Sequence, residues 1–274
     1  MSQQNDTGTA AEEPVFPTVR EVDAGAPLRW IRRGIDDFRA CPIPSLFYGF
    51  CFAAMGLLVT MVFEHAYEYT AAMTSGFLLL GPFLAMGLYE ISRRHEEGQV
   101  CALLPTLSVW RRNAGNIGIF AVVLGVVFLV WARASLVIFA LFYTNELPNL
   151  SGFLNQLVTL ENLEFLLVYF CVGLLFACIV FAASVISVPL MLDRNQDAIS
   201  SMLASIGALA RNPGAMAVWA LLIVILTIIG FLSFHLGLVV LMPVVGHASW
   251  HAYRDLVAPA GDAPPPTAPV EQAP

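Results

Sequence analysis

The sequence predicts an all-α membrane protein, a bundle of six transmembrane helices with amphipathic surface helices on the cytoplasmic side. Three observations lead to this fold class. Of the 274 residues, 58% are hydrophobic and only 12% are charged, too few charges to coat a soluble globule of this size. The apolar residues occur in blocks of about twenty, the length that crosses a bilayer as a helix. The arginines gather between those blocks.

Charge and cysteine content exclude several classes of protein. The net charge of −7 comes largely from the two tails and the short loops, and it gives no indication of nucleic-acid binding. None of the five cysteines forms a Cys-x-x-Cys pair, so neither a disulfide framework nor a zinc site is expected. The start of the chain is polar, without an apolar core behind a basic head, so no cleavable signal peptide is expected.

The N-terminal part of the chain predicts disorder followed by a surface helix. Residues 1–26 are rich in Gln, Thr, Ala, Glu and Pro and are expected to be a disordered cytoplasmic segment. Beyond them, Leu28, Ile31, Ile35 and Phe38 recur at helical spacing among charged residues. This pattern is typical of an amphipathic helix that lies on a membrane surface.

A single integral membrane domain is expected over residues 27–256. Its predicted spans cover about 45–64, 74–91, 117–143, 165–192, 215–230 and 236–251. The connections 93–113 and 193–212 each have one apolar side and are expected to lie on the membrane surface. Residues 257–274 are proline-rich and are expected to be a disordered cytoplasmic tail.

The fourth predicted span contains two local signals. Gly173-x-x-x-Ala177 predicts a small-residue face on which a neighbouring helix packs closely. Pro189 predicts a kink near the end of the span.

The arginines predict the orientation of the chain. Twelve of the thirteen lie in the N-terminal region, the two surface connections or the ends next to them, which share one side if there are six spans. By the positive-inside rule that side is the cytoplasm, so we expect both termini there and the chain in a bacterial inner membrane. The tryptophans are expected in interfacial belts: Trp30, Trp110, Trp219 and Trp250 on the inner side and Trp131 on the outer side.

Two similar runs precede predicted spans. Arg112-Asn113-Ala114-Gly115 lies ahead of the third span, and Arg211-Asn212-Pro213-Gly214 lies ahead of the fifth. Each run follows a surface segment, and each offers an Asn suited to capping a helix. We interpret the match as the same short arrangement used twice at the membrane interface. The alternative is a duplication of two three-span halves.

Arg133 interrupts the third predicted span. A charge inside a span costs on the order of 2.5 kcal/mol or more unless it is paired or reaches the interface. At about 1.5 Å per residue from Ile117 it lies roughly 24 Å along the helix, near the outer edge of the hydrocarbon. Two interpretations stay open: a side chain that extends to the interface, with Glu64, Glu161 or Glu164 as partner, or a buried ion pair that gates a polar pathway.

Three further groups of polar residues are candidates. Glu64, His65 and Glu68 form an outer cluster that either attracts cations or caps a short loop. His247 and His251 stand four apart on one helix face, the geometry that two ligands of one metal or haem would use. Neither pattern is complete, so no catalytic residue, metal or cofactor is predicted. Glu90 is expected to pair with Arg93 or Arg94 one turn later.

Four stretches carry a resemblance to a known family. They are the run around Trp30, Gly34, Asp37 and Arg39, the Gly81-Pro82 span with its Tyr89-Glu90 end, Trp110-Arg-Arg-Asn113, and the closing stretch 241–254. Together they are similar to a bacterial family of predicted integral membrane proteins, domain of unknown function 2189, over nearly everything between the tails. The resemblance implies a multi-pass inner-membrane protein with no assigned activity.

The predicted spans are almost free of polar residues, which suits packing against lipid or partner helices better than moving a hydrophilic solute. We therefore expect a non-enzymatic accessory or assembly subunit of a larger membrane complex, with a respiratory complex among the candidates. The expected partners are the lipid bilayer and other membrane-protein subunits, and not nucleic acid. The alternative is a small transporter or channel that uses the polar groups around Arg133. A haem protein based on His247 and His251 is the third and least favoured hypothesis.

Overall fold

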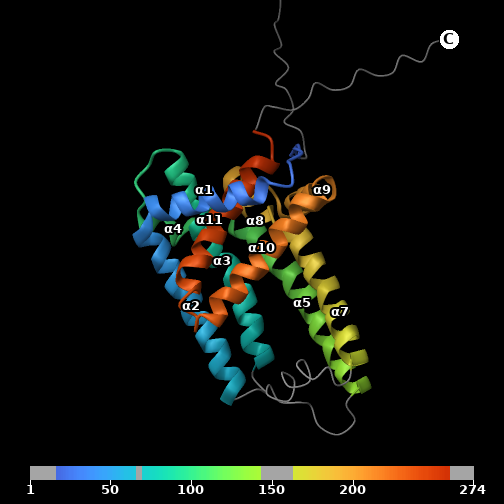
Figure 1. Ribbon diagram of the computed structural model, residues 1–274. Helices are drawn as coiled ribbons and strands as arrows, with labels where there is room; N and C mark the ends of the chain where they lie inside the picture. The colour runs from blue at the N-terminus through green and yellow to red at the C-terminus, as the bar shows by residue number, and fades with distance from the viewer. Residues whose placement is uncertain (1–16, 66–69, 143–162, 260–274) are drawn as a thin grey trace, which may run out of the picture.

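The computed structural model describes residues 17–65, 70–142 and 163–259, without the side chains of 62–80, 82 and 83. The described residues form helices, and no strand occurs among them. The helices are α1 (Ala26–Ala40), α2 (Pro42–His65), α3 (Thr70–Glu96), α4 (Leu103–Thr106), η2 (Val109–Asn113), α5 (Ala114–Phe142), α7 (Leu163–Ser184), α8 (Ser187–Arg194), α9 (Ala198–Arg211), α10 (Pro213–Leu232) and α11 (Leu238–Leu256). In Figure 1 the long helices form a bundle, and α1, α4, α8 and α9 lie across one end of it.

The all-helical membrane class is confirmed. Among the described residues, four segments are long and apolar enough to cross a membrane: Pro42–Met61, Leu103–Phe142, Leu163–Arg194 and Pro213–Leu232. Helix α11 corresponds to the sixth predicted span, but it is less apolar and most of its residues are buried inside the protein. Helices α2, α3, α10 and α11 pack together, and α5 and α7 lie side by side next to them (Figure 1).

The fourth predicted span is divided into two helices. Helix α7 ends at Ser184, and a separate buried helix, α8, begins at Ser187. The break lies at Val185, four residues before Pro189. The proline ring clashes with the carbonyl of Val185, and proline has no N–H to donate to that carbonyl. The N–H of Ile186 donates to Ser205 Oγ of α9, at 3.4 Å. The proline therefore ends a helix where a kink was expected.

Two surface helices join the following long helix through the same backbone geometry. Helix α1 is capped by Cys41 with φ −125° and ψ 55°, and α9 is capped by Asn212 with φ −127° and ψ 49°. At both positions the N–H donates to the carbonyl four residues back, and a proline begins the next helix. The fixed φ of proline suits that first helical position. The junction at Asn212 thus has a counterpart at Cys41, which sequence comparison missed.

The side chains of Asn113 and Asn212 form hydrogen bonds with backbone groups that are far away in the sequence. The Asn113 amide donates to the carbonyls of Met191 at 3.1 Å and Gln196 at 2.8 Å. The Asn212 side chain accepts the N–H of Val22 at 2.7 Å and makes no cap bond to α10. The capping prediction is therefore wrong for Asn212, because the side-chain oxygen that would accept the cap bond accepts the N–H of Val22 instead.

The N-terminal segment is ordered further than predicted. Val19 and Val257 form an isolated antiparallel bridge, in which the N–H of Arg20 donates to Leu256 O and the N–H of Ala258 donates to Thr18 O. Residues 17–25 and 257–259 therefore do not belong to the disordered tails. Backbone hydrogen bonds hold them, and composition alone does not reveal such bonds. The bridge places the two described ends of the chain side by side.

Helix α1 crosses α11 at a glycine. A Cβ on Gly34 would lie 2.7 Å from the Val244 carbonyl oxygen, so only glycine allows this approach.

Trp30, Trp219 and Trp250 are buried, so the prediction that they form an interfacial belt is wrong. Trp30 Nε1 donates to Asp255 at 2.8 Å, and Trp250 Nε1 donates to Glu96 at 3.0 Å. A partner inside the protein replaces the water that an interfacial indole would use.

Candidate functional site

Polar side chains from several helices gather at the end of the bundle that carries both described chain ends. We call this cluster the polar end. Its members are Asp37, Ser45, Glu90, Ser92, Arg93, Arg94, His95, Glu96, Arg112, Asp193, His247, Trp250, His251, Tyr253 and Arg254. Most of them lie in the four stretches that carry the family resemblance.

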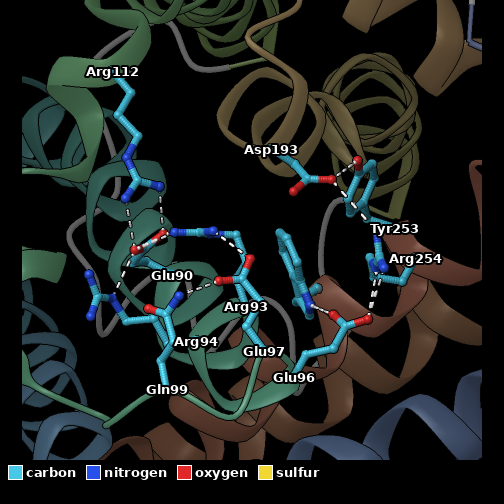
Figure 2. Close-up of polar contacts among 11 residues, drawn as sticks. Glu90, Arg93, Arg94, Glu96, Glu97, Gln99, Arg112, Asp193, Tyr253 and Arg254 are labelled. Carbon is cyan, nitrogen blue, oxygen red and sulfur yellow. Dashed lines mark hydrogen bonds and ion pairs between the residues drawn. The ribbon is translucent and has the colours of Figure 1, made fainter. Parts of the chain in front are cut away.

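Glu90 lies buried at the end of α3 among three arginines (Figure 2). Its side chain is 1% exposed; Oε1 accepts from Arg93 at 2.8 Å and Arg94 at 2.9 Å, and Oε2 accepts from Arg112 at 2.9 Å. The predicted pairing with Arg93 and Arg94 is confirmed. Arg112 is 22 residues away in η2, and no sequence pattern indicated it. The carboxylate thus fixes η2, and with it the start of α5, to the end of α3.

Asp37 joins α1 to α3 and α11. Its Oδ1 lies 2.8 Å from His95 Nδ1, and its Oδ2 lies 2.9 Å from His251 Nε2. Burial raises the pKa of Asp37, but hydrogen bonds from His251, Ser92 and His95 outweigh burial and lower the pKa to about 2. The carboxylate is therefore ionised at neutral pH and serves as an anionic acceptor for both rings.

His247 lies fully buried in α11 between two serine hydroxyls. Its Nε2 is 2.9 Å from Ser45 Oγ of α2, and its Nδ1 is 2.8 Å from Ser92 Oγ of α3. His251, its predicted companion, bonds Asp37 instead. The two rings are therefore engaged by different helices. The described part of the chain contains no group of three His, Cys, Asp or Glu that could hold a metal ion.

A second ionic group ties α11 to α3 and α8, on the right of Figure 2. Glu96 accepts from Trp250 Nε1 at 3.0 Å and from Arg254 at 2.9 Å. Asp193, near the end of α8, accepts from the Tyr253 hydroxyl at 2.5 Å. Hydrogen bonds to charged groups are roughly twice as strong as neutral ones. Asp37 and this second ionic group therefore both hold α11 in place.

Cys41 and Cys101 form a disulfide, with Cα atoms 5.7 Å apart. This bond corrects the prediction from cysteine spacing, which favoured no disulfide. The two residues are separated by 60 positions and share no spacing motif. Only the packing of the α1–α2 junction against the segment before α4 brings them together.

The outer candidates do not join the polar end. Arg133 lies exposed on α5, and it makes no ion pair with any residue that the structure describes. An exposed side chain fits extension to the interface better than a buried ion pair. Glu164 is exposed in the first turn of α7. Four candidates lie outside the description, wholly or by their side chains: Glu64, His65, Glu68 and Glu161.

A cavity of about 1000 Å³ lies between α2, α3, α5, α7, α10 and α11. Its lining residues come from the α5–α7 pair on one side and from the rest of the bundle on the other. Gly173 and Ala177 line it, and a Cβ on Gly173 would meet nothing within 4 Å. The prediction that these small residues pack closely on a neighbouring helix is therefore wrong. Arg133 is not among the lining residues.

Comparison with known proteins finds a match to a family whose description gives no activity. The model of a family described as predicted integral membrane protein, domain of unknown function 2189, matches residues 70–193. The match confirms the resemblance over α3 to α8, whereas the Trp30 run and the closing stretch 241–254 lie outside it. No curated protein and no solved structure matches the chain.

Proposed function

We propose that this protein, which matches a family of predicted integral membrane proteins over residues 70–193, is a non-enzymatic accessory or assembly subunit of a larger membrane complex. A respiratory complex is one candidate. The chain crosses a bacterial inner membrane six times, with the polar end and both termini in the cytoplasm. The distribution of arginines supports this orientation. The bridge between Val19 and Val257 supports an even number of crossings, since it brings the described ends together.

The exposure of the α5–α7 pair carries the proposal. Within an 18-residue apolar stretch of the span that contains α5, only 6% of the residues are buried inside the protein. The corresponding share is 11% in the span that contains α7 and 39% in α2. Large aliphatic and aromatic side chains cover the outer surface of the pair, among them Val130, Val137, Phe170 and Leu174. Helices associate in a membrane through van der Waals packing, which such a surface provides to a partner subunit.

The alternative, a transporter or channel that uses Arg133, has less support. Transport of a hydrophilic solute needs a polar path, and no charged residue of the described chain lines the cavity. Arg133 itself lies exposed on α5. These observations favour a subunit that packs against lipid and partner helices.

Native electrophoresis of mildly solubilised membranes tests the accessory function. We expect the wild-type chain to migrate in a band heavier than its 29.8 kDa, with partner subunits identified by mass spectrometry of that band. Val130→Trp with Val137→Trp, at positions each 53% exposed on α5, is expected to release the chain from the band. Val224→Trp with Ile228→Trp, at positions 52% and 51% exposed on α10, is the matched control and is expected to keep it. A wild-type chain that migrates alone, or equal behaviour of both variants, contradicts the proposal.

A further inference from the structure

Glycine occupies several wall positions of the cavity between the α5–α7 pair and the rest of the bundle. Gly125 of α5 and Gly173 of α7 both line it, and a Cβ on either would meet nothing within 4 Å. Protein interiors are normally packed without voids much larger than a water molecule. A space of about 1000 Å³ is at the upper end of the sizes of ligand sites.

The wall of the cavity is almost entirely apolar. Ser184 Oγ donates to Val180 O at 2.6 Å, and Thr227 Oγ1 donates to Ile223 O at 2.7 Å. The third hydroxyl belongs to Tyr89, a side chain that is 9% exposed. No charged residue lines the cavity within the part of the chain that the structure describes. A polar ligand would lose its hydrogen bonds with water and gain few in return.

We infer that this cavity binds the hydrocarbon tail of a membrane lipid. A tail needs apolar contact along its length and no hydrogen bonds, which is what the wall provides. The source of the tail is the bilayer itself, because α5 and α7 border the cavity and are apolar and exposed on their outer faces. This inference is independent of the accessory function.

The arginines next to α5 favour a phospholipid as the owner of the tail. Arg111 and Arg112 lie in η2, just before this helix, and both are exposed. Arg112 is paired with Glu90, whereas Arg111 lies over the Trp110 ring. Val122, the first α5 residue in the cavity wall, follows Arg112 by ten positions, about 15 Å along a helix. Cations at the cytoplasmic interface attract lipid phosphates. A phospholipid whose phosphate lies near these arginines has its acyl chain at the depth of the cavity.

Native mass spectrometry of the full-length protein in detergent tests the inference. One arm adds a dioleoyl phospholipid, and the other adds an isoprenoid quinone, which has a tail but no phosphate. We expect the wild type to retain one phospholipid. Gly125→Leu with Gly173→Leu is expected to reduce its retention at least tenfold, because the two leucine side chains would enter the cavity where the tail lies. Gly118→Leu, on the same helix α5 at an open position outside the wall, is expected to retain the wild-type amount.

Ala177→Leu, a smaller change in the wall, keeps the test decisive if the double variant does not fold. It is expected to reduce phospholipid retention as well, with a wild-type elution volume in gel filtration. Retention that no wall variant reduces, or no retained lipid in either arm, overturns the inference. Retention of the quinone alone overturns the assignment to a phospholipid.

Discussion

Oδ2 of Asp37 lies 2.9 Å from Nε2 of His251, although the two residues are 214 positions apart in the sequence. The other oxygen of the same carboxylate binds His95 at 2.8 Å. One buried side chain of α1 therefore holds both α3 and α11. Its removal must weaken the fold more than the removal of an exposed carboxylate from the same helix.

Asp37→Asn is expected to lower the free energy of unfolding by about 1–3 kcal/mol, because two imidazoles lose their anionic acceptor. Asp36→Asn is the matched control on the same helix. The Asp36 side chain is 62% exposed and lies 3.9 Å from Arg39, so its loss is expected to cost about 0.5 kcal/mol or less. Denaturant titration of both variants in one detergent measures the difference. Equal losses would contradict the role given to Asp37.

The same carboxylate predicts a dependence of stability on pH. Its pKa is lowered from 3.8 to about 2 in the folded protein. A group of this kind stabilises the fold above its unfolded pKa, and the stabilisation is lost as the pH falls through the folded pKa. The melting temperature of the wild type should therefore fall more steeply than that of Asp37→Asn between about pH 4 and about pH 2. Parallel curves would assign the acid sensitivity to another group.

Glu90→Gln is expected to destabilise the protein by about 3–5 kcal/mol, because three arginines lose a buried counter-charge. Glu97→Gln serves as the control. Glu97 also pairs with Arg93, at 2.6 Å, but its side chain is 40% exposed, so solvent screens the pair. Thermal unfolding followed by circular dichroism compares the two. A Glu90 variant as stable as the Glu97 variant would show that the arginine cluster does not need its carboxylate.

The sequence predicted the helices of this site better than its contacts. Glu90 with Arg93 and Arg94 was predictable, because helical spacing brings residues three and four apart together. Arg112 and the partners of Asp37 were not, since they come from other helices and only tertiary packing sets their distance. His247 and His251 share a helix face as expected, yet their partners are serines and an aspartate from different helices.

Gly34→Ala is expected to destabilise the protein by about 1–3 kcal/mol, because the added methyl group would overlap the backbone of α11 at Val244. Gly115→Ala is the control within a helix, since its Cβ meets nothing within 4 Å. Alanine is also the better helix former, so the control variant should be unchanged or slightly more stable. Melting temperatures in one detergent check both. A loss of stability in the control alone would contradict the close crossing of α1 and α11.

Maleimide labelling under denaturing conditions tests the disulfide. Of the five cysteines, Cys51, Cys171 and Cys178 are free, so three labels are expected without reductant and five after reduction. In Cys101→Ala, Cys41 becomes free, and four labels are expected with or without reductant. Mass spectrometry of the intact chain counts the labels. Five labels on the unreduced wild type would show that Cys41 and Cys101 are close but not bonded.

The least predictable features arise from packing between helices. Gly173 and Ala177 have the spacing of a helix-packing motif, but a motif does not show whether a neighbour fills the space above it. Here they face a cavity. Pro189 was recognised as a disturbance, yet whether a proline bends or ends a helix depends on partners for the freed backbone groups, and Ser205 provides one for Ile186.

The orientation of the polar end underlies the proposed function, and reporter fusions at the two termini measure it most directly. One reporter should be a protein that fluoresces only in the cytoplasm, and the other a phosphatase that is active only outside it. We predict fluorescence and no phosphatase activity at both termini, because Val19 and Val257 pair at the end of the bundle that carries most of the arginines. Reporters that place the two termini on opposite sides of the membrane, or both outside, would contradict this orientation.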